Sequence, residues 1–172
     1  MTTTTLPILR DGTWTIRPDE ATASFTVREL GLIPVRGGFP VTGGSVTVAG
    51  SRPVSATATL DAAGVRTGIR KRDADLRGRH FFHTAEHPRI EVRSTRISPA
   101  GDGWTATAVL TVAGGEVPLE LQVGSRPGTT PDTVRIRVSG VLDRAASRIR
   151  APRWLIGRWV AIAVDATLDR PR

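Results

Sequence analysis

The chain has 172 residues and no cysteine, so it is long enough to bury a sizeable core and depends on neither disulfides nor thiolate metal sites. Its net charge of +8 comes almost wholly from arginine and could attract nucleic acid, anionic lipid or phosphorylated ligands. The arginines are scattered and no aromatic ladder accompanies them. We therefore expect no nucleic-acid binding, and a basic domain that binds nucleic acid or an anionic surface remains a weaker alternative function.

The amino-terminal residues carry no pattern typical of a targeting segment. Residues 1–9 lack the basic region and the apolar stretch of a secretory signal peptide. No later run approaches the ~20 apolar residues that a membrane span needs. We expect a cytoplasmic protein without a membrane span, in which residues 1–12 form a disordered or extended segment and residues 13–170 form one domain.

Nine segments alternate between apolar and polar residues, which is the pattern of half-buried β-strands. Clusters of Gly, Pro, Asp or Ser separate most of them, and Gly114–Gly115 between two such segments predicts a hairpin. The pattern therefore predicts an all-β fold, either an antiparallel barrel or a sandwich. The predicted strands cover residues 13–17, 22–30, 45–49, 54–60, 90–97, 104–112, 116–123, 133–142 and 159–168.

Each predicted strand has one apolar face, which suits a barrel with an apolar interior and a solvated exterior. Many residues on these inner faces are small, among them Ala56, Ala58, Ala106 and Ala108. Small inward side chains either leave a lumen for one small ligand or pack against large ones in a solid core. The alternation by itself leaves both interiors open.

The stretch from Thr67 to Ser94 interrupts the strand pattern. The residues RKRDADLRG predict a short helical segment near residues 70–82, with Gly78 at the point where a helix would end. The aromatic pair Phe81–Phe82 follows, and Pro88 ends any helical continuation. This insertion either forms the mouth of a site or is a solvated basic turn whose two aromatic residues plug one end of the core.

The same stretch resembles a motif of the YceI-like family, whose members are also described as polyisoprenoid-binding or lipocalin-like proteins. The family pattern is a Thr, a short gap, RDxHLRSxxFFD and then YPxIxFxS. LTVAGGEVPLELQV and WLIGRWVAIAVDATL are similar to later family segments, and Gly37–Gly38–Phe39 matches a Gly–Phe turn, so the resemblance runs from about residue 14 to 168. The motif positions that match are Thr67, Arg72, Asp73, Leu76, Arg77, Phe81, Phe82, Pro88, Ile90 and Ser94.

The resemblance implies a single antiparallel, lipocalin-like β-barrel of about eight strands with an apolar lumen. Such a protein would bind, and sequester or carry, a hydrophobic small molecule such as an isoprenoid or another long-chain lipid. We expect no cofactor other than that ligand, and a homodimer is a further option. The residues expected to line the ligand site are Phe25, Val27, Glu29, Phe39, Ala58, Phe81, Phe82, Ile90, Val92, Ala108, Leu110, Leu119, Leu121, Ile136, Val138 and Trp154.

A basic rim could hold an anionic headgroup at the mouth of the lumen through charge-assisted hydrogen bonds. The expected contacts are Arg70, Arg72, Arg77 and Arg79, and a second loop adds Arg150, Arg153 and Arg158 if both loops meet there. Because Arg72 and Asp73 belong to the family motif, part of this set could instead be a structural ion pair.

Three departures from the family pattern concern charged or titratable residues. Glu20 and Glu29 stand where the family commonly has histidine, and His83 stands where it has Asp. Glu29 shares a strand face with Phe25, so its carboxylate either points inward, with Arg96 as a partner, or lies solvated past the strand end. An inward Glu29 supports the alternative function, a small enzyme that uses this residue as acid or base on a hydrophobic substrate.

The three histidines, His80, His83 and His87, could place two imidazoles near one metal ion on a helical turn, with Glu86 or Asp75 as the carboxylate. The family is not characterised by a metal there, so we expect none. No Ser-His-Asp arrangement or nucleotide-binding loop occurs, and we expect no catalytic residues. Binding is therefore favoured over catalysis.

Overall fold

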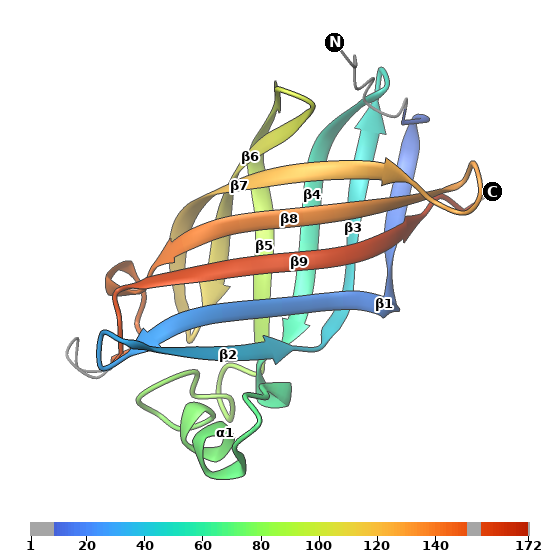
Figure 1. Ribbon diagram of the computed structural model, residues 1–172. Helices are drawn as coiled ribbons and strands as arrows, with labels where there is room; N and C mark the ends of the chain where they lie inside the picture. The colour runs from blue at the N-terminus through green and yellow to red at the C-terminus, as the bar shows by residue number, and fades with distance from the viewer. Residues whose placement is uncertain (1–8, 151–155, 172) are drawn as a thin grey trace.

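The computed structural model describes residues 9–150 and 156–171. These described residues form nine β-strands, one short α-helix and two 3-10 turns, arranged as Figure 1 shows. The strands are β1 (Gly12–Glu29), β2 (Ile33–Phe39), β3 (Val41–Ala49), β4 (Arg52–Asp61), β5 (Arg89–Ala100), β6 (Gly103–Val112), β7 (Gly115–Pro127), β8 (Thr133–Asp143) and β9 (Trp159–Asp169). The helix α1 spans Arg70–Leu76, and the 3-10 turns span Ala62–Gly64 and Arg144–Ala146.

One antiparallel sheet contains all nine strands and closes on itself. Its order is β2-β1-β3-β4-β5-β6-β7-β8-β9, and β1 also pairs with β9. Eight strands therefore form a closed ring, and β2 extends the sheet beside β1. The predicted all-β, lipocalin-like barrel of about eight strands is confirmed.

β1 is one long strand where the sequence predicted two, at residues 13–17 and 22–30. Its pairing with β9 shifts register between Ile16 and Ala21, and Pro18 lies within that irregular stretch. Proline has no N–H for the ladder and is tolerated where regular pairing is interrupted. The strand continues past this point, so the amino-terminal half of β1 pairs with β3 and the carboxy-terminal half with β2.

β2 was not predicted, because Pro34 and the Gly37–Gly38 pair hide its strand character. The expected Gly–Phe turn lies inside this strand, and the actual β1–β2 turn is formed by residues 30–32. Gly37 is required by packing, since a Cβ there would lie 2.4 Å from the ring of Phe25. Likewise, Gly43 and Gly44 lie within β3 and not in a turn before it.

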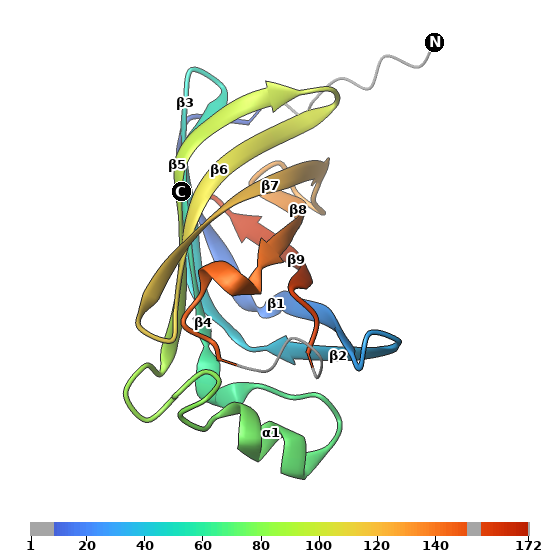
Figure 2. The ribbon, with the colours of Figure 1, turned by 90° about the vertical axis from the view of Figure 1, so that its left-hand side faces the viewer.

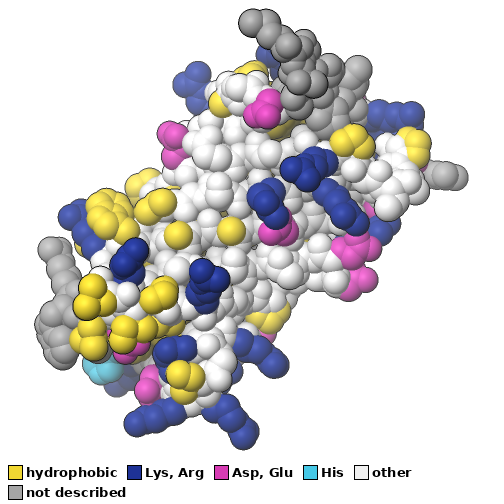
Figure 3. Space-filling view, in the orientation of Figure 1, with side chains coloured by type: hydrophobic (Ala, Val, Ile, Leu, Met, Phe, Trp, Pro, Cys, Tyr) yellow, Lys and Arg dark blue, Asp and Glu magenta, His cyan; other side chains and the backbone are white. Residues whose placement is uncertain are grey.

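The interior follows the predicted alternation along most strands. Along β6, for example, Ala106, Ala108, Leu110 and Val112 are all buried, and Val117 opposite them on β7 is 1% exposed. Most of the described arginines lie on the outer surface, and Figure 3 shows basic side chains spread over the visible face. Hydrophobic side chains gather toward the end of the barrel with the β1–β2 turn, where Leu32 is 80% exposed.

The segment between β4 and β5 leaves the sheet and lies across one end of the barrel (Figure 2). α1 ends at Leu76, earlier than the predicted helical segment near residues 70–82, and Arg77 is already the C-cap residue. Residues 78–86 continue as turns. No helix in residues 9–150 or 156–171 has the length and apolar character to cross a membrane.

Candidate functional site

The barrel interior contains two apolar cavities that adjoin each other. The upper cavity has a volume of about 170 Å³ and lies between β1 and β3–β9. The lower cavity has a volume of about 160 Å³. It lies at the end covered by residues 62–88, the segment between β4 and β5 that contains α1 and that we call the α1 segment. Both are lined by a waist that we define as Leu60, Val92, Ile162, Ala163 and Val164. The lumen therefore contains two hollows that share these lining residues.

Small side chains create the upper cavity. Ala56, Ala58, Ala106 and Ala108 all line it, opposite larger residues of β7–β9. Ser94 also faces inward, and its hydroxyl oxygen accepts a hydrogen bond of 2.8 Å from the amide of Ala56. This bond satisfies the polar group, so the lining remains effectively apolar.

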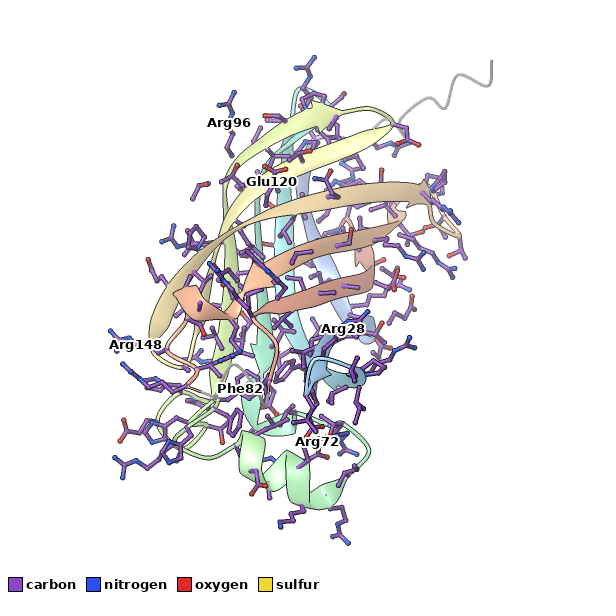
Figure 4. The ribbon with its side chains drawn as sticks, turned by 60° about the vertical axis from the view of Figure 1, so that its left-hand side comes forward. Arg28, Arg72, Phe82, Arg96, Glu120 and Arg148 are labelled. Carbon is purple, nitrogen blue, oxygen red and sulfur yellow. The ribbon has the colours of Figure 1, made fainter. Side chains whose placement is uncertain are left out.

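Three phenylalanines from distant segments meet in the lower cavity. The rings of Phe25 and Phe39 lie 5.5 Å apart between centroids, and Phe82 meets Phe39 edge-to-face at 5.1 Å. Such tilted and edge-to-face pairs are favourable aromatic geometries. Figure 4 shows Phe82 at the barrel end next to the α1 segment. Phe82 and its neighbour Phe81 therefore line the lower cavity at this end of the barrel, and their closing of the lumen stays a prediction.

The α1 segment is anchored through Thr67. The carboxylate of Asp73 accepts hydrogen bonds from the amide (2.8 Å) and the hydroxyl (2.6 Å) of Thr67, while Arg72 donates to the hydroxyl and the carbonyl of Thr67. The hydrogen bond from the Thr67 hydroxyl is the main cause of a lowered pKa of Asp73. Arg77 donates to the carbonyl of Ala63 at 2.7 Å. The motif residues Arg72, Asp73 and Arg77 thus hold the segment on the barrel.

A polar pocket of about 500 Å³ lies outside the lower end. Phe81 lines both this pocket and the lower cavity, so the two are neighbours. Arg79 of the first loop and Arg150 of the second both line this pocket, and its role as a mouth that holds a headgroup stays a prediction. Arg70 lies exposed on α1 and does not line it, and Arg158 pairs instead with Asp143. Arg153 lies outside the described residues.

Of the two placements open for Glu29, the inward one with Arg96 as its partner is wrong. Glu29 lies at the end of β1 beside the β1–β2 turn and lines neither cavity. In β5, Ser94 pairs with Ala108 and Arg96 with Thr107, so Thr95 is an extra residue and forms a bulge. The bulge turns Arg96 to the exposed outer face, as Figure 4 shows, and Ile97 lines the lumen in its place.

The other residues expected to contact the ligand line one of the two cavities, with the exception of Trp154, which lies outside the described residues. Their role in binding stays a prediction. The upper cavity is lined by Ala58, Val92, Ala108, Leu119, Leu121, Ile136 and Val138. The lower cavity is lined by Phe25, Val27, Phe39, Phe81, Phe82, Ile90, Val92 and Leu110.

The sequence-based selection missed other lining residues. Trp14, Trp104 and Ile162 stand on predicted inner faces, so the alternation itself could have found them. Ile149 and Arg144 come from the irregular segment after β8, where no periodic signal exists. Arg144 is 7% exposed and donates to the carbonyls of Gly157 at 3.0 Å and Ile156 at 2.7 Å.

Residues 14–168 match the model of the YceI-like domain family. The chain belongs to the YceI-like family. Among curated relatives, a UPF0312 protein of Yersinia pestis is 29% identical over 100 residues, a match that covers 57% of this chain and 52% of the relative. This YceI-like chain thus spans about half the length of the curated relatives it matches.

Two solved structures share the fold. BcnA of Burkholderia cenocepacia is 20% identical with a TM-score of 0.74, and the match covers 88% of this chain and 98% of BcnA. A polyisoprenoid-binding domain from Saccharophagus degradans, implicated in plant cell wall breakdown, is 20% identical with a TM-score of 0.67. That match covers 92% of this chain and 98% of the domain.

Proposed function

We propose that the protein binds an elongated hydrophobic small molecule of the isoprenoid or long-chain lipid class in its lumen, and so sequesters or carries it. The observation that carries the proposal is the pair of adjoining apolar cavities inside a closed barrel. The polyisoprenoid-binding domain with the same fold supports the class of ligand.

The lining explains how such a ligand would be selected. Removing apolar surface from water contributes roughly 25 cal/mol per Å² before the entropy costs of association. Few polar groups face the lumen, so length and shape decide affinity more than directional hydrogen bonds. Together the cavities come near the lower end of the ~300–1,000 Å³ typical of ligand pockets. A chain that fills both would pass between the waist side chains, such as Val92, that line both cavities.

The test is mass spectrometry of an organic extract of the purified protein. We expect a bound chain of defined length in the wild-type extract and a depleted or shorter one from Ala108→Phe protein, whose new side chain would enter the upper cavity. An outward change on the same strand, Thr107→Phe, is the matched control. Extracts that contain no lipid, together with no saturable binding of a long-chain fluorescent probe, would contradict the proposal.

An anionic headgroup at the lower end is part of the same proposal. Attraction at this exposed rim is screened by salt, with a Debye length of about 8 Å at physiological ionic strength. An isoprenoid phosphate should therefore bind more tightly than its neutral alcohol at low salt, and Arg79→Ala should remove that advantage. Arg70→Ala is the control, since Arg70 lies outside the pocket. Equal affinities for the two ligands would exclude a headgroup site.

The alternative function, an enzyme acting in the same lumen, would need an acid–base pair there, and the described lining residues provide none. Among the described residues that line the two cavities, Arg144 is the sole ionisable one, and it donates to backbone carbonyls. Glu29 lies outside both cavities, so Glu29→Gln is expected to leave ligand binding unchanged. The cytoplasmic location and the homodimer stay predictions, which cell fractionation and light scattering would test.

A further inference from the structure

A cluster of metal-ligating side chains lies outside the lumen, in the turn segment between α1 and β5. One nitrogen each of His83 and His87 and one carboxylate oxygen of Glu86 all lie within 4.8 Å of one another. All three side chains come from a single five-residue segment. Of these, Glu86 is exposed and both histidines are half-buried.

The backbone folds this segment into one turn. The carbonyl of His83 accepts hydrogen bonds from the amides of Glu86 at 3.1 Å and His87 at 2.9 Å. His83 itself has a φ of 47°, and its amide donates to the carbonyl of Gly78 at 3.0 Å. A non-glycine residue in the left-handed region costs free energy and persists where the surroundings hold it. The turn places the two imidazoles four residues apart on one side.

The ring of His87 is also held from the barrel side. Gly114 in the β6–β7 turn has a φ of +76°, and a Cβ there would lie 2.6 Å from Cε1 of His87. The imidazole therefore packs directly on the backbone of this turn. The rings of His83 and His87 meet edge-to-face with centroids 5.6 Å apart. The imidazole of His87 is thus positioned before any ion binds.

We propose that His83, Glu86 and His87 form a binding site for a divalent transition-metal ion such as Zn²⁺, with the remaining coordination position open. Two imidazoles and one carboxylate suit Zn²⁺, Co²⁺, Ni²⁺ or Cu²⁺ better than Mg²⁺ or Ca²⁺. Bonds of about 2.0–2.2 Å in a tetrahedral site require donor atoms roughly 3.4 Å apart. Side-chain rotations of Glu86 and His83 would close that gap.

The neighbouring charged side chains affect how tightly the site would bind a metal ion. Arg79, Arg148 and Arg150 line the same polar pocket as His83 and His87, and their permanent positive charges oppose a dication. The carboxylate of Glu86 offsets one of them. We therefore expect weaker binding than in closed four-ligand zinc sites, and an open position that favours an anionic ligand.

Metal binding at this site would stabilise the turn that directly follows Phe81 and Phe82, two residues that line the lower cavity. Phe82 precedes His83 directly and packs on Phe39, and Phe81 lines the lower cavity. An ion that binds the folded turn and not the unfolded chain raises stability by mass action. The site should consequently stabilise the protein whether or not a lipid is bound.

The test uses full-length protein without an affinity tag, stripped of metal with EDTA and then dialysed. Titration calorimetry with Zn²⁺ should give one saturable site, and Co²⁺ should give visible absorption bands of a low-symmetry site. His87→Ala should weaken Zn²⁺ binding at least about tenfold, because one of three protein ligands is lost. His80→Ala is the matched control, since His80 lines the same pocket and lies outside the cluster.

A second variant separates loss of a ligand from loss of structure. Glu86→Gln changes an exposed side chain, so the fold is preserved while the charged donor is lost. We expect it also to weaken Zn²⁺ binding about tenfold. An absence of saturable binding in wild-type protein, an unchanged affinity in Glu86→Gln, or an equal loss in His80→Ala would each overturn the proposal. None of these readouts depends on a lipid ligand.

Discussion

The substitution Ala108→Phe tests directly whether the lumen is hollow and occupied by ligand. Ala108 is 1% exposed, pairs with Ser94 on one side and Leu119 on the other, and lines the upper cavity. A cavity of about 150 Å³ is known to hold benzene, so a phenyl ring nearly fills the 170 Å³ available here. The substitution should therefore block the upper cavity and leave the lower one open.

Ala108→Phe should change the free energy of unfolding little and the affinity for a long ligand strongly. Burying the new ring contributes about 1.5–3 kcal/mol and overpacking costs about 1–3 kcal/mol, so the two nearly cancel in the free energy of unfolding. A ligand excluded from the upper cavity loses the burial of about six carbons, at roughly 0.8 kcal/mol each. That loss, about 5 kcal/mol, corresponds to more than a thousandfold in Kd.

The assay compares two probes in three proteins. A fluorescent long-chain probe and a short one that fits the lower cavity are titrated into wild type, Ala108→Phe and the outward control Thr107→Phe. We expect Ala108→Phe to lose the long probe and keep the short one, with a melting temperature within about 8 °C of wild type. The control should bind both.

Two results would refute this reasoning. If Ala108→Phe loses more than about 3 kcal/mol of stability, the interior is solid and overpacking dominates. If the long probe binds with unchanged affinity, the ligand does not occupy the upper cavity.

Two further predictions concern the segment that closes the barrel. The folded protein lowers the pKa of Asp73, so the ionised carboxylate of Asp73 stabilises the fold. This stabilisation is fully present above the ordinary aspartate pKa of about 3.9 and is lost as the pH falls through the lowered pKa of the folded state. Thr67→Val should consequently lower the melting temperature at pH 7 and much less at pH 3; an equal difference at both pH values would contradict this. Phe82→Ala should cost about 2 kcal/mol in urea unfolding, since it removes the edge-to-face contact with Phe39, whereas Phe81→Ala should mainly speed probe release. Equal, small effects of the two changes would remove both rings from the closure of the lumen.

The barrel could be predicted wherever strands alternate regularly. β6 and β7 pair without irregularity around the turn at Ala113–Gly114, so each inner-face residue was placed correctly. In β5 the alternation predicted the wrong inner-face residues after Ser94. The bulge at Thr95 adds one residue, and one extra residue reverses which side chains face inward. A period-two pattern contains no signal for such an insertion when the residues on both faces are polar.

Only part of the candidate site could be predicted from the sequence. The lining residues on strands follow from alternation, whereas the roles of the charged residues depend on hydrogen bonds between distant segments. Arg72 and Arg77 were expected at a headgroup and instead donate to Thr67 and Ala63. The approach of His87 to Gly114 joins residues 27 positions apart, and no local pattern indicates it.

The pairing of β1 with β9 has a consequence for how the chain folds. Ala23 lies opposite Val164, so the barrel closes through contacts between residues about 140 positions apart. Sheets dominated by such distant pairings fold slowly, and the amino-terminal strand is synthesised long before its partner. A polypeptide that stops at Asp143 would leave one side of both β1 and β8 as free sheet edges, which are templates for aggregation. Solubility during synthesis should therefore depend on β9, which emerges after the other eight described strands.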